Sequence, residues 1–130
     1  YDVIKYDKRM IPGLFTYAIR KKALIKCRKL FLKKPNSEMV DSYFEDVKLK
    51  MRTIKTDKFF LNKKIRLTLD YKEDLVFFKK LYSAVNITES SKNIISYLKQ
   101  NMDITKINYF RNFYWKKNQK SKIINNKLKI

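Results

Sequence analysis

Apolar residues recur with a period of two in short stretches of the chain, which is the pattern of β-strands with one apolar face. The clearest stretch is residues 65–69, whose sequence is IRLTL. Residues 47–55 place lysine and arginine between apolar positions, which indicates a strand near the edge of a sheet. Residues 1–6 and 14–19 are two further strand candidates. The aromatic and branched residues of 14–19 predict that this strand is well buried.

Apolar residues recur with helical spacing in other parts of the chain. The predicted helices cover residues 20–32, 37–46, 71–85 and 90–100, with Ser37 as the cap of the second and Ser90 or Ser91 as the cap of the last. In the first helix Cys27 lies on the apolar stripe, which predicts a core residue rather than a reactive thiol. Basic residues fill the opposite face of that helix, and a solvated surface is the plain interpretation of this face.

Asp70 stands at the junction between the predicted strand 65–69 and the helix that follows it. Glu73 lies three residues later, which is the spacing of a capping box and predicts Asp70 as the N-cap. A carboxylate at the carboxyl end of a strand is also where open α/β sheets place ligand and metal chemistry. Spacing alone leaves two interpretations of Asp70 open, a plain helix cap and a metal ligand.

Strands alternate with helices along the chain, so the predicted fold class is α/β, a mixed sheet flanked by helices. The few strands would need more sheet beside them, and the chain begins at Tyr1 within a predicted strand. We therefore expect a piece of a longer protein. We expect one domain over residues 1–117 with a helical C-terminal extension. Residues 118–130 are rich in lysine, asparagine and isoleucine with little pattern, which predicts a mobile basic tail.

The composition excludes several kinds of functional site. The 130 residues include one glycine, one cysteine and no histidine. The chain therefore has no glycine-rich phosphate loop, no internal disulfide, no zinc site of the usual cysteine and histidine kinds, and no Ser-His-Asp or Cys-His triad. The longest mostly apolar run, residues 10–19, is too short to span a bilayer. A cytoplasmic protein is the default prediction.

The formal net charge of +20 suits a polyanionic partner, such as nucleic acid or an anionic membrane. The excess is mostly lysine and is spread over the whole chain instead of forming one block. Binding of nucleic acid is therefore not the predicted main role. An aromatic and basic run at residues 109–117 keeps a nucleic-acid-binding domain open as an alternative.

Four stretches of the chain match, in order, motifs of a known family. Residues 66–75 (RLTLDYKEDL) resemble the signature RLTxDxPEDL, and Pro12-Gly13-Leu14 followed by Ala23-Leu24 is similar to the stretch PxGLDVEVFSFEAL. Glu38-Met39-Val40 and Tyr43 align with the family motif REHVTPY. Ile107-Asn108 matches the final IN of the pattern L…P…IN near the end of the family. These motifs belong to cytidylyltransferases of the spore coat polysaccharide biosynthesis protein F type, which are similar to the CMP-sugar synthetases that activate 3-deoxy-manno-octulosonate. The resemblance spans nearly the whole chain and corresponds to the C-terminal half of the family.

The resemblance implies a nucleotide-diphospho-sugar transferase fold and an enzyme that forms CMP-sugars for surface polysaccharides. In such enzymes a sugar hydroxyl attacks the α-phosphate of CTP and releases pyrophosphate, while Mg²⁺ neutralises charge at the transferring group. By resemblance, Asp70 matches the aspartate that helps hold the metal, and Tyr17 and Arg66 take positions expected to bind substrate. The implied partners are CTP and a sugar or sugar acid. The family's nucleotide loop lies in its other half, so we expect this chain alone to be inactive.

The chain departs from the family at several polar positions. Tyr17 replaces a glutamate, Ser37 and Met39 replace an arginine and a histidine, and Lys72 replaces a proline. These departures keep open a catalytically inactive relative that binds a sugar or a protein partner.

Two further expectations concern structure rather than chemistry. Glu73 and Asp74 match the signature, but acidic residues suit the first turn of a helix, so we expect both to be structural. The aromatic cluster at residues 109–115 is a candidate homodimer interface, with a place in the core as the alternative.

Overall fold

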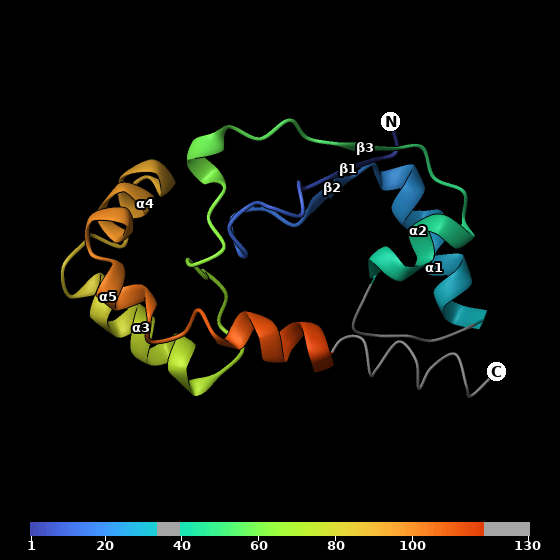
Figure 1. Ribbon diagram of the computed structural model, residues 1–130. Coiled ribbons are helices and arrows are strands. Elements are labelled where there is room, and N and C mark those ends of the chain that lie inside the picture. Colours follow the sequence, from blue (N-terminus) through green and yellow to red (C-terminus); the bar gives the residue numbers. More distant parts are fainter. Residues whose placement is uncertain (34–39, 119–130) are drawn as a thin grey trace. The chain divides into compact units, whose positions relative to one another are not determined.

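The computed structural model describes residues 1–33 and 40–118 (Figure 1). The chain groups into two compact units: unit 1 comprises Tyr1–Lys8 and Phe15–Asp57, and unit 2 comprises Arg9–Leu14 and Lys58–Ile130. The predicted cap Ser37 lies outside the described residues, as does the predicted tail after its first residue, Asn118.

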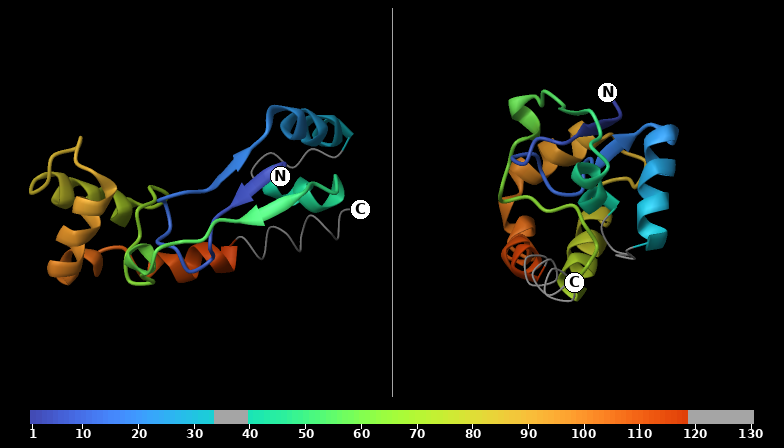
Figure 2. Two further views of the ribbon diagram at one scale, coloured as in Figure 1. Left: turned by 90° about the horizontal axis from the view of Figure 1, so that it is seen from above. Right: turned by 90° about the vertical axis from the view of Figure 1, so that its right-hand side faces the viewer.

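Unit 1 contains a three-stranded mixed sheet that follows the first three predicted strands (Figure 2). The central strand β1 (Val3–Lys5) pairs antiparallel with β2 (Tyr17–Ile19) and parallel with β3 (Met51–Thr53). β3 is an edge strand, as its basic residues predicted. β2 is also an edge strand and its middle residue, Ala18, is exposed, so the prediction that it is well buried is wrong.

The helical part of unit 1 consists of α1 (Lys21–Lys33), the 3₁₀ turn η1 (Val40–Ser42) and the short helix α2 (Tyr43–Asp46). α1 confirms the predicted helix over residues 20–32 almost to the residue. Within the described residues, the predicted helix over 37–46 is reduced to η1 and one turn of α2.

The core of unit 1 gathers around Val3, which lies opposite Ile19 in β2 and Met51 in β3. Its buried side chains come from the sheet, from α1 and from the segment around α2: Val3, Ala23, Cys27, Tyr43, Phe44 and Leu49. Cys27 is thus a buried core residue, as its place on the apolar stripe predicted.

The regular secondary structure of the described residues of unit 2 is helical apart from one isolated bridge between Met10 and Leu61. Its elements are η2 (Lys58–Phe60), α3 (Lys72–Tyr82), α4 (Ser91–Gln100), α5 (Met102–Thr105) and a helical segment at residues 111–118. α3 and α4 confirm two predicted helices. Ser90 caps α4, because its Oγ accepts the backbone N–H of Asn93 at 3.2 Å.

One hydrophobic core serves the helices of unit 2, since α5 contacts both α3 and α4. Its fully or almost fully buried members are Ile11, Ile65, Phe77, Leu81, Ile95, Leu98 and Ile104. The buried side of α3 therefore carries Phe77 and Leu81, whereas Leu75 is exposed.

The segment at residues 65–69 is not a strand, so this prediction is wrong. The backbone N–H of Leu67 donates to the carbonyl of Pro12 at 2.8 Å. Among the described residues, this segment forms no ladder of hydrogen bonds with another strand. The alternation also fails as a guide to burial. Arg66 is buried, because Asp74 neutralises its charge inside unit 2. Leu69, on the apolar side of the pattern, is 63% exposed.

The α/β class is confirmed for the described residues, which form a three-stranded mixed sheet and helices. The helical segment at residues 111–118 agrees with the expected helical extension. None of the described helices is both long and apolar enough to cross a membrane. The nucleotide-diphospho-sugar transferase fold stays a prediction.

Candidate functional site

The first turn of α3 is fixed by Asp74. The N-cap is Tyr71, which has extended backbone angles, and not Asp70, so the helix begins one residue later than predicted. Asp74 takes the role predicted for Glu73: its Oδ2 accepts the N–H of Tyr71 at 3.0 Å and the N–H of Asp70 at 2.9 Å. The carboxylate therefore holds the turn that carries Asp70.

Arg66 and Asp74 form a buried bidentate ion pair inside unit 2. Nε of Arg66 donates to Oδ1 of Asp74 at 2.9 Å and Nη2 donates to Oδ2 at 3.1 Å. Burial alone raises the pKa of Asp74, but hydrogen bonds from Arg66, the Asp70 backbone and Asn108 outweigh it, and the pKa lies below its usual value. The two parallel hydrogen bonds of this fork join opposite charges in the interior of unit 2.

Arg66 also reaches Asp70, the residue expected to hold a metal. Nη2 of Arg66 donates to Oδ2 of Asp70 at 2.7 Å, and the Asp70 side chain is 44% exposed. The Asp70 side chain is thus oriented by a buried residue and is open to solvent directly after residues 65–69. Arg66, expected from the resemblance to bind substrate, is itself almost completely buried. In this geometry Arg66 orients the Asp70 side chain and is not itself exposed to solvent.

Two asparagines complete the surroundings of Arg66. Nδ2 of Asn108 donates to Oδ1 of Asp74 at 2.9 Å and to the backbone carbonyl of Arg66 at 3.2 Å. Nη1 of Arg66 donates to Oδ1 of Asn112 at 3.0 Å. One polar network therefore joins residues more than 30 positions apart in the chain. Its hydrogen bonds hold the Arg66 side chain in one orientation.

Gly13 packs against the backbone of the same segment. A Cβ at residue 13 would lie 1.9 Å from the carbonyl oxygen of Leu67, and Gly13 has φ of +95°. Both observations require glycine here. The Cβ of any other residue would overlap Leu67, and residues with a Cβ rarely adopt this φ. The neighbouring hydrogen bond, from the N–H of Leu67 to the carbonyl of Pro12, holds the two backbone segments together.

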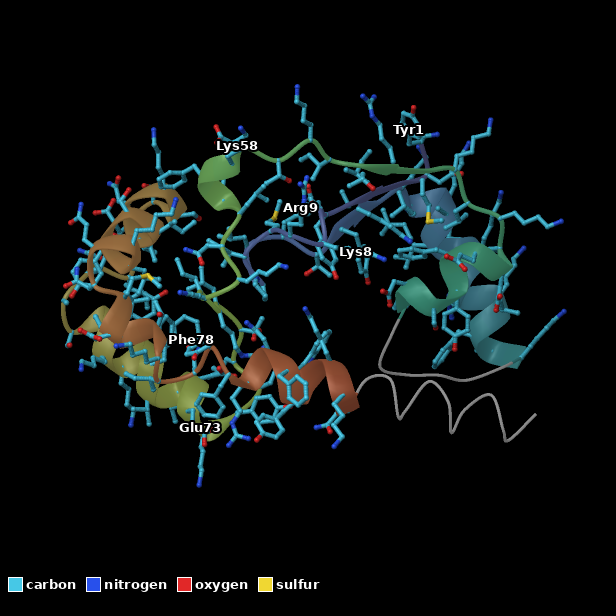
Figure 3. The ribbon with its side chains drawn as sticks, viewed as in Figure 1. Tyr1, Lys8, Arg9, Lys58, Glu73 and Phe78 are labelled. Carbon is cyan, nitrogen blue, oxygen red and sulfur yellow. The ribbon has the colours of Figure 1, made fainter. Side chains whose placement is uncertain are left out.

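Glu73 makes a second ion pair at the start of α3, next to the helical segment 111–118 (Figure 3). Its two oxygens accept hydrogen bonds from Arg111, at 2.9 Å from Nε and 2.5 Å from Nη2. The hydrogen bond with Arg111 lowers the pKa of Glu73 below its usual value. The guanidinium also lies over the ring of Tyr71, 4.9 Å from its centroid. Glu73 and Asp74 both stabilise the packing of α3, which agrees with the structural role expected for them.

Tyr17 lies in unit 1, where it lines a small pocket. The pocket has a volume of about 100 Å³ and is lined by Lys5, Tyr6, Lys8, Thr16, Tyr17, Asp41 and Phe44. This volume is below the roughly 300 Å³ of a typical small-molecule site. It suits one functional group of a ligand and not a whole nucleotide. Burial, and next the charge of Asp41, raise the pKa of Tyr17, so its hydroxyl stays a hydrogen-bond donor at neutral pH.

Among the described residues, Asp70 is a candidate metal ligand without a surrounding cluster of further candidate ligands. Among residues 1–33 and 40–118, no group of three or more acidic, histidine or cysteine side chains is arranged to hold an ion. Mg²⁺ is usually bound through one or two carboxylates together with substrate phosphates and water. The exposed Asp70 carboxylate fits such a partial role, although Arg66 already neutralises one of its oxygens.

The aromatic cluster at residues 109–115 is mainly at the surface. Tyr109, Phe110, Phe113 and Tyr114 are exposed, which is against a place in the core of unit 2. A homodimer interface at this cluster stays a prediction.

The sequence pattern missed the group that organises this site. The alternation over residues 65–69 predicts Arg66 on the polar face of a strand, and helix preferences predict Asp74 only as an acidic residue of the first turn. No sequence signal indicates a role for Asn112. One signal could have indicated the network, since Arg66, Asp70 and Asp74 are spaced four residues apart with an Arg followed by two carboxylates. Asn108 lies in the Ile107-Asn108 motif, but no spacing rule connects it with Asp74, 34 positions away.

Comparisons of this chain with protein-family models, with curated proteins and with solved structures find no match. Membership in the cytidylyltransferase family therefore stays a prediction from the motif residues.

Proposed function

We propose that this chain is the C-terminal part of a cytidylyltransferase that forms a CMP-sugar from CTP and a sugar or sugar acid, for surface polysaccharide synthesis in the cytoplasm. The observation that carries the proposal is the convergence of motif residues in unit 2. Gly13, the segment 66–75 and Asn108 belong to three separate motifs of the resemblance. Gly13 packs against Leu67 and Asn108 donates to Arg66 and Asp74, so two of the motifs contact the third.

This convergence supports a single ancestral unit rather than three chance matches. Gly13 fits closely against Leu67, and Asn108 binds the Arg66 carbonyl and the Asp74 carboxylate. Each motif residue is of the type that its contact demands: a glycine without a Cβ, an amide that donates twice, and a carboxylate that accepts from Arg66.

The placement of Asp70 supports nucleotidyl transfer over simple binding. The side chain follows the extended segment, is half-exposed, and is held by Arg66 at 2.7 Å. Bound Mg²⁺ supplies charge neutralisation at the phosphoryl group in this class of reaction. Asp70 would provide one carboxylate oxygen for it, and the remaining ligands and the nucleotide loop would come from residues outside this sequence. Tyr17 lies in unit 1, and its proposed role in binding substrate rests on the resemblance.

A catalytically inactive relative is the second candidate, and one contact favours it. Arg66 places a positive charge against the oxygen Oδ2 of Asp70, which lowers the attraction of that carboxylate for a cation. The replacement of the family's glutamate by Tyr17 points the same way. The two candidates agree on the fold and differ in turnover.

Release of pyrophosphate separates the two candidates. The assay uses a polypeptide that joins this chain to the family's nucleotide loop, with each of the four nucleoside triphosphates, a panel of sugar acids, and either Mg²⁺ or a chelator. The proposal predicts release with CTP and Mg²⁺ and background release with the chelator. A folded polypeptide that binds a sugar acid but releases no pyrophosphate from any nucleotide identifies the inactive relative and contradicts the enzyme.

A further inference from the structure

α1 presents an unusual outward face. Its 13 residues, KKALIKCRKLFLK, include six basic side chains and no acidic one. Acidic residues three or four positions away from a lysine or arginine on a helix stabilise it by pairing with the charge. α1 contains no such acidic residue, and outside the helix the charge of Asp2 acts on Lys26, which is not part of the face that carries Ile25 and Leu32.

Apolar side chains lie in the middle of this basic face. Ala23 and Cys27 mark the inner side of α1, where they pack in the core of unit 1. With 3.6 residues per turn, Ile25 and Leu32 fall on the opposite side, and they are 47% and 69% exposed. The exposed basic residues on this side, on either flank of Ile25 and Leu32, are Lys21, Arg28 and Lys29.

We infer that this outward face of α1 binds the surface of an anionic phospholipid bilayer. A helix that lies in the interface places apolar side chains among the acyl chains and lysines among the lipid phosphates. Ile25 and Leu32 provide the apolar line, and Lys21, Arg28 and Lys29 provide the flanking cations. With 13 residues α1 would lie on the membrane and not across it.

Two other occupants fit the face less well. A second copy of this chain carries the same net charge of +20 and the same basic helix, so the two faces repel each other. A polynucleotide would bind the lysines, but phosphate contacts leave Ile25 and Leu32 without a partner. Of these three occupants, the lipid surface is the one that engages both the charges and the apolar side chains. The inference does not depend on the proposed enzymatic function, because it uses residues outside the candidate site.

Sedimentation with lipid vesicles tests the inference on the 130-residue chain. The chain should bind vesicles of phosphatidylcholine with phosphatidylserine and should not bind phosphatidylcholine alone. K21Q/R28Q/K29Q should lower the partition coefficient roughly 100-fold, at about fivefold per charge. I25S/L32S leaves the charge unchanged and should lower the partition coefficient about tenfold or more, because two exposed side chains no longer enter the bilayer.

Matched variants in unit 2 control for charge and for hydrophobicity. K58Q/K63Q/K64Q removes three exposed lysines, and V76S/I87S removes two exposed apolar side chains. Both controls should change binding less than about twofold if α1 is the contact. The inference is overturned if the parent chain does not bind the anionic vesicles, or if the lysine control weakens binding as much as the α1 triple variant. Unchanged binding by I25S/L32S would also overturn it, since binding would then be to charge alone, as expected for a polynucleotide site.

Discussion

Arg66 holds Asp74 in a two-point contact in the interior of unit 2, with Nε–Oδ1 at 2.9 Å and Nη2–Oδ2 at 3.1 Å. The Arg66 side chain is 2% exposed and that of Asp74 is 0% exposed. The pair joins the segment before α3 to the helix itself. Because the same guanidinium contacts Asp70, the stability of this region and the placement of the candidate metal ligand have one cause.

Replacement of Asp74 by asparagine should destabilise the protein strongly. D74N preserves the shape of the side chain but leaves the buried Arg66 charge with only the half-exposed Asp70 as an ionic partner. We expect the free energy of unfolding to fall by about 3–5 kcal/mol, as is usual when one partner of a buried ion pair is removed. Urea denaturation followed by circular dichroism measures it.

The control for D74N is D103N. Asp103 pairs with Lys106 at the surface, where its side chain is 89% exposed, so its replacement should leave the unfolding midpoint unchanged. Equal midpoints for D74N and the parent chain would mean that the Arg66–Asp74 pair does not hold unit 2 together.

The same pair predicts how stability depends on pH. The pKa of Asp74 is lower in the folded chain than in the unfolded one, so the unfolded chain takes up a proton first as the pH falls. The contribution of Asp74 is therefore complete above the unfolded pKa of about 4 and is lost below it. Urea titrations between neutral and acidic pH should show the parent chain and D74N converging below about pH 4. A difference between them that is constant over the whole range would contradict the depressed pKa.

Gly13 should not tolerate alanine. Its φ of +95° alone disfavours any other residue by about 1–2 kcal/mol. The added Cβ would also meet the carbonyl oxygen of Leu67 at 1.9 Å, so the backbone of one segment must move. We expect G13A to lower the unfolding midpoint in urea by more than the unfavourable φ alone would, because the overlap with Leu67 adds to it.

A84G removes a methyl group at an exposed position and serves as the comparison for G13A. It should cost no more than about 1 kcal/mol. Similar midpoints for G13A and A84G would show that Gly13 and Leu67 are not in close contact.

The cap of α4 allows a smaller, local test. Oγ of Ser90 accepts the N–H of Asn93, and removing such a cap usually costs about 1 kcal/mol. S90A should therefore lower the free energy of unfolding by this amount, while S91A, at the first position inside the helix, should have little effect. If S91A proved the more damaging variant, the cap would be misassigned by one residue.

The sequence pattern is most reliable where burial follows periodicity alone. α1 and α4 were predicted nearly to the residue, because Ala23, Cys27, Ile95 and Leu98 bury at helical spacing without ionic partners. The three strands of unit 1 were also located, with bounds that were too long.

The pattern fails where a buried charge controls the backbone. Arg66 was placed on the solvent side of a strand, since nothing local indicates that Asp74 and Asn108 will neutralise it and bind its carbonyl. The position of the α3 cap failed for the same reason. Both Glu73 and Asp74 can supply the capping carboxylate, and the tertiary partners decide: Arg111 binds Glu73, and Arg66 binds Asp74.

The candidate site was predicted in part. Asp70 and Arg66 were both named from the motif, and the structure brings them to 2.7 Å. Their roles could not be read from spacing, because the burial of one and the exposure of the other depend on residues more than 30 positions away.

Pyrophosphate release by D70N tests the central claim most directly, in a polypeptide that joins this chain to the family's nucleotide loop. Asp70 is half-exposed, so its replacement should change the free energy of unfolding by no more than about 1 kcal/mol. The account predicts that D70N retains the parent fold and loses Mg²⁺-dependent release from CTP, while D103N, with an equal change of charge, retains it. Parent-level turnover by D70N would contradict the account and remove Asp70 from the site.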